Sequence, residues 1–151
     1  MTVGGLSTSD INNMLSGVKI FKGTFPSDLV PLRSKTKTQA FVINTSGNNL
    51  PGSHWVALIV SDGKCRYFDS FGVENLNLDI LTVLKEVGIT NYDFCSRQIQ
   101  PLYSDKCGFY CVAFILSFVH GISYRKFIDI FSDDLEINDK ICLQFLNEIY
   151  F

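Results

Sequence analysis

The hydrophobic pattern over the first half of the chain predicts short strands. Residues 19–25 alternate between polar and apolar side chains, and residues 39–44 form an apolar run of strand length. Residues 55–60 predict a buried strand and residues 65–68 its return strand, because the Asp62-Gly63 step between them is a strong hairpin signal. These two strands are therefore expected to pair antiparallel.

The second half of the chain carries helical patterns. Apolar positions at helical spacing predict a helix over residues 76–87, and the apolar run 107–119 predicts a central helix buried on all sides. Amphipathic helices are expected over residues 124–131 and 137–150, and a further strand over residues 92–99.

Two segments are rich in small and turn-forming residues. Residues 45–52 predict an exposed loop, and Gly4-Gly5 suits a flexible lead into the chain. Residues 10–15 suit a short helix whose N-cap is Ser7, Thr8 or Ser9.

Length and composition indicate one globular domain over residues 1–151. The chain has a mass of 17.0 kDa, with 46% hydrophobic and 19% charged residues. Strands followed by helices, with one hairpin, predict an α+β fold in which a small, mostly antiparallel sheet packs against helices. The run 107–119 is too short for a membrane span, which needs about 20 residues, and the start of the chain does not predict a signal peptide.

Charge and cysteine content narrow the function classes. A net charge of −2 gives no global attraction to nucleic acid, and the small basic cluster over residues 33–37 is read as a solvated loop. The number of cysteines is odd and no two form a CxxC pair, so free thiols in a reducing compartment are expected. They are Cys65, Cys95, Cys107, Cys111 and Cys142.

Cys107 is a candidate nucleophile because it begins the central helix. A helix N-terminus beside a histidine lowers the pKa of a thiol, and the first-turn N–H groups, which have no partner within the helix, can bind an oxyanion. Gly108 is expected to let a substrate approach closely, since it has no Cβ. A metal pair with Cys111 is the weaker interpretation, because no other ligands cluster nearby.

Geometry selects the base between the two histidines. At about 1.5 Å rise per residue, His120 lies roughly 20 Å from Cys107 at the other end of the same helix. His54, at the start of a strand, remains. If Ser61 pairs with Lys64, His54 lies opposite Phe71 and shares a face diagonally with Asp69, which could orient the imidazole. Each residue alone has a plain packing interpretation, so it is the combination that predicts a thiol hydrolase.

Three segments of the sequence resemble adenain, the maturation protease family of adenoviruses. They are Gly52-Ser53-His54-Trp55, then Tyr-Phe-Asp-Ser-Phe-Gly over residues 67–72, and Gln100 followed by Ser-Asp-Lys-Cys-Gly-Phe-Tyr-Cys over residues 104–111. The clan also includes the SUMO-specific proteases, but the interval from Gln100 to Cys107 is the adenain one. The likeness covers nearly the whole chain.

The resemblance implies a papain-like, adenain-like cysteine protease with no metal or organic cofactor. By it, Cys107 is the nucleophile, His54 the general base and acid, Asp69 the orienting acid, and Gln100 a side-chain oxyanion donor. It implies a viral endopeptidase that trims capsid or core precursors, after small residues such as glycine, in the virion and the infected host cell. A monomer is expected.

Departures from the family bear on partners. Adenain enzymes carry Glu where this chain has Asp69, and they are longer and basic, so the stimulation by DNA known in the family is not expected here. The family's activating peptide is tethered through a cysteine, for which Cys95 is the nearest candidate, although its spacing differs. Two alternatives stay open: an isopeptidase acting on ubiquitin or a ubiquitin-like modifier, and a catalytically silent binding module.

Overall fold

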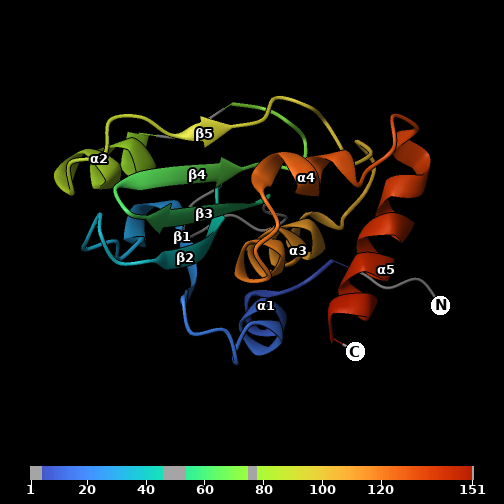
Figure 1. The fold of residues 1–151 in the computed structure, drawn as a ribbon, viewed down its shortest axis with the longest axis horizontal. Helices are drawn as coiled ribbons and strands as arrows, with labels where there is room; N and C mark the ends of the chain where they lie inside the picture. Colours follow the sequence, from blue (N-terminus) through green and yellow to red (C-terminus); the bar gives the residue numbers. More distant parts are fainter. Residues whose placement is uncertain (1–4, 46–53, 75–77, 151) are drawn as a thin grey trace.

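The computed structural model describes residues 5–45, 54–74 and 78–150 of the chain. Its centre is a five-stranded sheet in the order β1-β2-β3-β4-β5 (Figure 1). The strands are β1 (Phe21–Pro26), β2 (Gln39–Asn44), β3 (Trp55–Ser61), β4 (Lys64–Phe68) and β5 (Asp93–Phe94). The β2–β3 and β3–β4 pairings are antiparallel, whereas the two outer pairings are parallel.

The hairpin β3–β4 has the predicted register. Ser61 pairs with Lys64, and Asp62 and Gly63 adopt positive φ angles of 51° and 75°. Two consecutive positive φ angles are the geometry of the tight turn that matches the twist of the flanking strands. The sequence prediction for these two strands is therefore confirmed.

The strand predicted over residues 92–99 is mostly wrong. Only Asp93 and Phe94 pair with β4. Farther along, the N–H groups of Ile99 and Gln100 both donate to the carbonyl of Ser70, at 3.0 Å each. This segment is held by the turn that follows β4, so its apolar residues are buried without forming a ladder. The loop predicted over residues 45–52 lies, apart from Thr45, outside the described residues.

The helices follow the predictions closely. The five α-helices are α1 (Thr8–Met14), α2 (Leu78–Glu86), α3 (Cys107–Val119), α4 (Tyr124–Asp129) and α5 (Asn138–Tyr150). Ser7 caps α1 in a reciprocal capping box with Asp10. Two short 3₁₀ turns, Ser27–Leu29 and Leu135–Ile137, complete the described elements.

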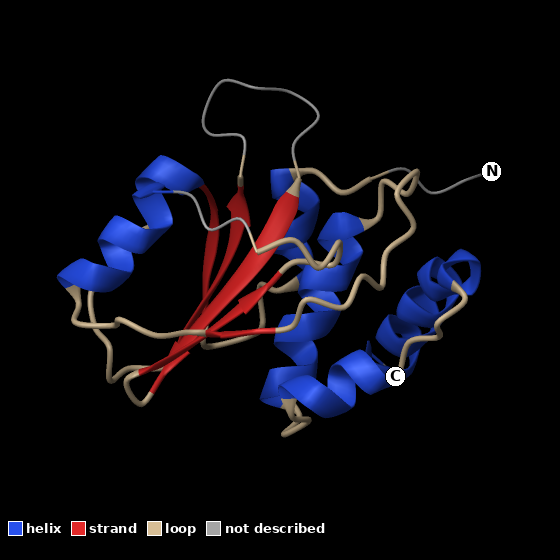
Figure 2. Cartoon of the chain, turned by 90° about the horizontal axis from the view of Figure 1, so that it is seen from above, coloured by secondary structure: helices blue, strands red, loops and turns tan. Residues whose placement is uncertain are grey.

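Helices cover both faces of the sheet (Figure 2). One core lies between the sheet and α2, and the larger core joins the opposite face to α1, α3, α4 and α5. Side chains of β3 alternate between them: Ala57 and Ile59 face α3, while Val56 and Leu58 face the α2 side. This explains why β3 is apolar from Trp55 to Val60 instead of alternating with polar residues.

Helix α3 is the centre of the larger core. Every residue from 107 to 117 is buried, as the all-apolar pattern predicts. The ring of Phe114 stacks on Phe68 of β4, with centroids 4.7 Å apart, and Phe127 of α4 packs edge-on against both. No helix among the described residues combines the length and the hydropathy that crossing a bilayer demands.

Gly72 fixes the distance between the turn after β4 and the segment before α3. It has a φ of +69°, and a Cβ there would lie 2.5 Å from the carbonyl oxygen of Ser96 and 2.8 Å from backbone atoms of Arg97 and Gln98. Backbone atoms cannot swing aside as a flexible side chain can. The turn after β4 can therefore pack this closely against residues 96–98 only because residue 72 is a glycine.

We expect Gly72→Ala to lower the free energy of unfolding by more than about 4 kcal/mol, the range of substitutions that force backbone to move. Gly63→Ala is the matched control, because its φ is also positive, at +75°, but nothing lies within 4 Å of its Cβ. Gly63→Ala should lower the free energy of unfolding by only about 1–2 kcal/mol, the cost of placing an L-residue in the left-handed region. Urea unfolding of both variants measures the difference, and equal losses would contradict the packing argument.

Candidate active site

Cys107 lies at the start of α3 and next to the start of β3. Its sulfur accepts a hydrogen bond from the backbone N–H of Trp55, at 3.5 Å. No side chain among the residues that the structure describes caps this end of α3. The N–H groups of the first turn have no partner within the helix, as at any helix start. The N-terminal end of the helix dipole therefore stabilises negative charge at the sulfur.

His54 and Asp69 are brought together by the β3–β4 register. The imidazole Nε2 and the carboxylate Oδ1 lie 2.6 Å apart, and Asp69 is only 5% exposed. The backbone N–H of Phe71 donates to the same oxygen at 2.9 Å. The Phe71 ring lies 4.8 Å from the imidazole, centroid to centroid, and limits its rotation. The carboxylate and the aromatic ring together hold the orientation of His54.

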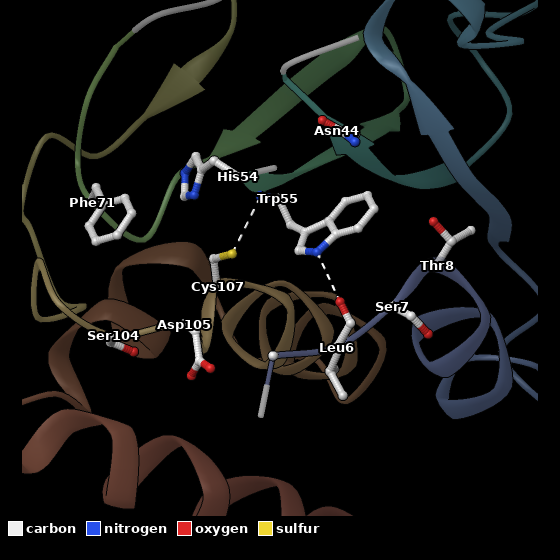
Figure 3. Close-up of a pocket in the computed structure, with 11 residues that line it drawn as sticks. Leu6, Ser7, Thr8, Asn44, His54, Trp55, Phe71, Ser104, Asp105 and Cys107 are labelled. Carbon is white, nitrogen blue, oxygen red and sulfur yellow. Dashed lines mark hydrogen bonds between the residues drawn. The ribbon is translucent and has the colours of Figure 1, made fainter. Parts of the chain in front are cut away.

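The other ring nitrogen of His54 faces the site. Nδ1 is buried and has no hydrogen-bond partner among the residues that the structure describes. Figure 3 shows the His54 ring beside the Cys107 sulfur, with Trp55 on the other side of the sulfur. Nδ1 is thus the atom that can exchange a proton with a group bound at Cys107.

The surroundings of His54 favour its protonated form, because they raise its pKa. Burial lowers its pKa, but the hydrogen bond to the Asp69 carboxylate, the negative charge of that carboxylate and the nearby Cys107 side chain outweigh burial and raise the pKa from 6.5 to about 9. An imidazolium next to a thiol stabilises the thiolate.

The structure places Gln100 behind the site. Its side chain is fully buried, its Oε1 accepts from the Ser70 hydroxyl at 2.5 Å, and its Nε2 donates to the Ser104 carbonyl at 2.9 Å and to the Ser104 hydroxyl at 3.2 Å. Gln100 does not line the pocket around Cys107. Its role as oxyanion donor stays a prediction, and its observed role is to brace the loop before Cys107.

A pocket of about 620 Å³ opens in front of Cys107 (Figure 3). One wall comes from the segment before α1, where the carbonyl of Leu6 accepts from the Trp55 indole N–H at 3.2 Å. The lining residues are Gly5, Leu6, Ser7, Thr8, Asn44, His54, Trp55, Phe71, Ser104, Asp105 and Cys107.

Sequence reasoning missed this wall and misread Gly108. Gly5 is no free lead, because a Cβ on it would lie 2.8 Å from the carbonyl oxygen of Asp105; Gly4 lies outside the described residues. A Cβ on Gly108 would meet Leu6 at 3.1 Å, so Gly108 admits the N-terminal segment instead of a substrate. The sequence offered one sign of these close contacts, which is that residues 5 and 108 are both glycines.

The other thiols are not equivalent to Cys107. All five cysteines are free, and Cys65, Cys111 and Cys142 are buried. Burial raises the pKa of Cys65 to about 12 and raises the pKa values of Cys111 and Cys142 well above that of an ordinary thiol. These three are packing residues.

A family model described as adenovirus endoprotease matches residues 18–129. The chain belongs to the adenovirus endoprotease family. It is 28% identical over 133 residues to the protease of Bovine adenovirus 4, a match that covers 77% of this chain and 66% of that protease. With the protease of Human adenovirus B serotype 3 it is 26% identical over 114 residues, covering 66% of this chain and 54% of that protein. The chain thus spans from about half to two thirds of the length of these members of the adenovirus endoprotease family.

Solved structures agree with the family at the level of the fold. The crystal structure of the ASFV pS273R protease superposes with a TM-score of 0.62 at 18% identity, covering 97% of this chain and 68% of that one. The central domain of the uncharacterized Lpg1148 protein from Legionella pneumophila gives a TM-score of 0.56 at 13% identity, covering 98% and 97%. The expected adenain-like α+β fold is confirmed.

We expect the imidazole of His54 to titrate near pH 9 and Asp69→Asn to move that titration to lower pH, because the substitution removes the negative charge that raises the pKa. The folded state binds this proton more tightly than the unfolded chain. Its contribution to stability is therefore complete below about pH 6.5 and is lost as pH rises through about 9.

Proton NMR of the ring signals measures the titration. His120→Ala, which leaves one histidine, assigns the signal to His54. A titration of His54 that is the same with and without the Asp69 carboxylate would contradict the assigned ion pair.

Proposed function

We propose that this protein is a cysteine endopeptidase in which Cys107 is the nucleophile, His54 the general acid and base, and Asp69 the residue that orients His54. The proposal is carried by the half-buried imidazole of His54. A carboxylate lies at its Nε2, and the cysteine at the start of α3 lies on the side of its buried Nδ1. A packing histidine would use both ring nitrogens for structural hydrogen bonds.

The first half of the reaction acylates Cys107. The thiolate attacks the scissile carbonyl carbon, a C–S bond forms, and the carbonyl electron pair moves to oxygen to give a tetrahedral oxyanion. When the intermediate collapses, the C–N bond breaks and His54 gives its Nδ1 proton to the departing amine. The C-terminal part of the substrate leaves as a free amine.

The second half releases the acyl group. Neutral His54 takes a proton from water, whose oxygen attacks the thioester carbon, and collapse returns the electron pair of the C–S bond to sulfur. A carboxylic acid product and the thiolate–imidazolium pair result. Asp69 stays ionised and hydrogen-bonded to Nε2 throughout, so that the ring does not turn.

Backbone N–H groups at the start of α3 stabilise the oxyanion. The backbone N–H of Cys107 is the first donor, because it belongs to the unpaired N–H groups of the first turn. Gln100 is the proposed second donor. To reach an oxyanion, its amide must exchange one of its contacts with Ser104, of which the longer is the one to the hydroxyl at 3.2 Å.

For the substrate we propose viral capsid or core precursor polypeptides. This follows from membership in a family of adenovirus proteases and implies action in the virion and the infected cell. An activating peptide remains part of the proposal. Cys95, its candidate tether, is a free and half-buried thiol next to the edge strand β5.

We expect Cys107→Ala and His54→Ala to abolish peptide hydrolysis, a loss on the order of 10⁶-fold in kcat where nucleophile and base act as a unit. Asp69→Asn should cost on the order of a hundredfold less, as removal of the orienting carboxylate does in such units. Mass spectrometry of a peptide library after incubation measures cleavage. Retained activity in Cys107→Ala would refute the protease assignment.

Cys111→Ala is the matched control for the nucleophile. Cys111 is one turn further along the same helix, fully buried and outside the pocket. Its replacement should leave kcat unchanged at temperatures where the protein is folded. Near-UV circular dichroism of both cysteine variants checks that folding is equal.

A second experiment addresses the substrate class. Ubiquitin, SUMO and Nedd8 probes that carry a C-terminal electrophile label proteases of ubiquitin-like modifiers. We expect none of them to label Cys107 while a small thiol-directed reagent does. Labelling by any of the three would replace the precursor-processing proposal with an isopeptidase function.

A further inference from the structure

Helix α5 begins next to the loop that leads to the nucleophile. The Oδ1 atom of Asp139, in its first turn, accepts from the Ser104 hydroxyl at 3.0 Å and from the Tyr110 hydroxyl at 2.8 Å. Ser104 lies in the pre-nucleophile loop, residues 101–106, and Tyr110 lies in the first turn of α3. One carboxylate oxygen thus joins α5 to both sides of Cys107.

The carboxylate determines the direction of the hydrogen bonds around it. An ionised carboxylate only accepts, so the Ser104 hydroxyl gives its proton to Asp139. The Ser104 oxygen must then act as acceptor toward its other two neighbours, the Lys106 N–H at 3.1 Å and the Gln100 amide at 3.2 Å. Asp139 therefore fixes the Ser104 hydroxyl as an acceptor for Gln100, beside the Ser104 carbonyl, which accepts from the same amide nitrogen at 2.9 Å.

The oxygen of the Gln100 side-chain amide is also held by a hydrogen bond. The Ser70 hydroxyl donates to Oε1, so the oxygen side of the amide points to Ser70 and the nitrogen side to Ser104. The residue before Gln100 is also tied to α5, because Asn138 donates from Nδ2 to the carbonyl of Ile99 at 2.8 Å. The first two residues of α5 hold the backbone and the side-chain orientation around Gln100.

We propose that Asp139 is a positioning residue for the oxyanion side of the site. It acts through Ser104, by holding the Gln100 amide with its N–H groups toward the loop. The proposal rests on the proposed protease function. Asp139 lies beyond residue 129, where the match to the family model ends, so the match does not assign it.

Two separate hydrogen bonds of Asp139 allow a positioning role to be distinguished from a purely structural role in the core. Asp139 makes one contact to the loop, through Ser104, and one to the core helix, through Tyr110. A structural role would act through both contacts and disturb the whole site. A positioning role acts through Ser104 and leaves the Cys107–His54 pair as it is.

The experiment compares Asp139→Asn, Asp139→Ala and Ser104→Ala with Tyr110→Phe in the full chain. Tyr110→Phe removes only the contact of Asp139 to the core and serves as the matched control. Peptide hydrolysis gives kcat and KM. The rate of alkylation of Cys107 by iodoacetamide against pH reports on the thiolate–imidazolium pair, because that displacement forms no tetrahedral oxyanion.

We expect the Asp139 and Ser104 variants to lose roughly tenfold to a hundredfold in kcat, less than the 10²–10³ of deleting an oxyanion donor outright. KM and the alkylation profile should stay within about twofold, as should all the values for Tyr110→Phe. The double variant Asp139→Ala with Ser104→Ala should lose no more than either single one, since both act through one contact. Asp139→Asn, nearly equal in size, gives the answer if the alanine variant does not fold.

Three results would overturn the proposal: unchanged kcat in Asp139→Asn and Asp139→Ala, equal losses in hydrolysis and alkylation, or an equal loss in Tyr110→Phe. Failure of the protease function itself looks different. In that case the wild-type chain hydrolyses no peptide, and alkylation of Cys107 is no faster than that of the other thiols.

Discussion

The register of one β-hairpin decides whether this protein has a reactive site at all. Side chains alternate across a strand, so a slip of one residue between β3 and β4 would put His54 and Asp69 on opposite faces of the sheet. The two-residue turn with consecutive positive φ angles prevents that slip, because the turn length fixes which residues face each other. The short Nε2–Oδ1 contact is a consequence of that turn, and the raised pKa of His54 follows in part from the contact.

The second partner of the site is held by packing. Helix α3 is buried along nearly its whole length between the sheet and the other helices, which leaves its first residue no freedom to move away from β3. Only the N-terminal end reaches the pocket. A sulfur at such a place gains from the helix dipole and from the imidazolium, and it pays little entropy when a substrate binds.

These two elements could be predicted because their signals are local. The Asp62-Gly63 step gave the hairpin, and with it the pairing of His54 with Asp69; the apolar run after Cys107 gave the helix. The rest of the site comes from contacts between residues distant in sequence. Nothing near Ser104 indicates that Asp139 binds it, and nothing near Leu6 indicates that it bonds Trp55.

The surroundings of Gln100 could not be predicted from its position in the chain. The resemblance assigns this residue an oxyanion role, and the structure adds that its amide is engaged with Ser70 and Ser104 behind the pocket. Local sequence cannot reveal this, because the direction of a side-chain amide depends on the donors and acceptors that surround it. The parallel pairing of the outer strands could not be predicted either, because parallel partners are distant in sequence.

The thiols of this chain differ in burial, so their labelling rates can report how often the larger core opens. Cys111 and Cys142 have no accessible surface, whereas Cys107 borders the pocket. A labelling reagent can meet the first two only when the larger core opens, so their labelling rates follow the population of opened molecules. The intact fold and its rare excursions can therefore be followed in one sample, without any introduced probe.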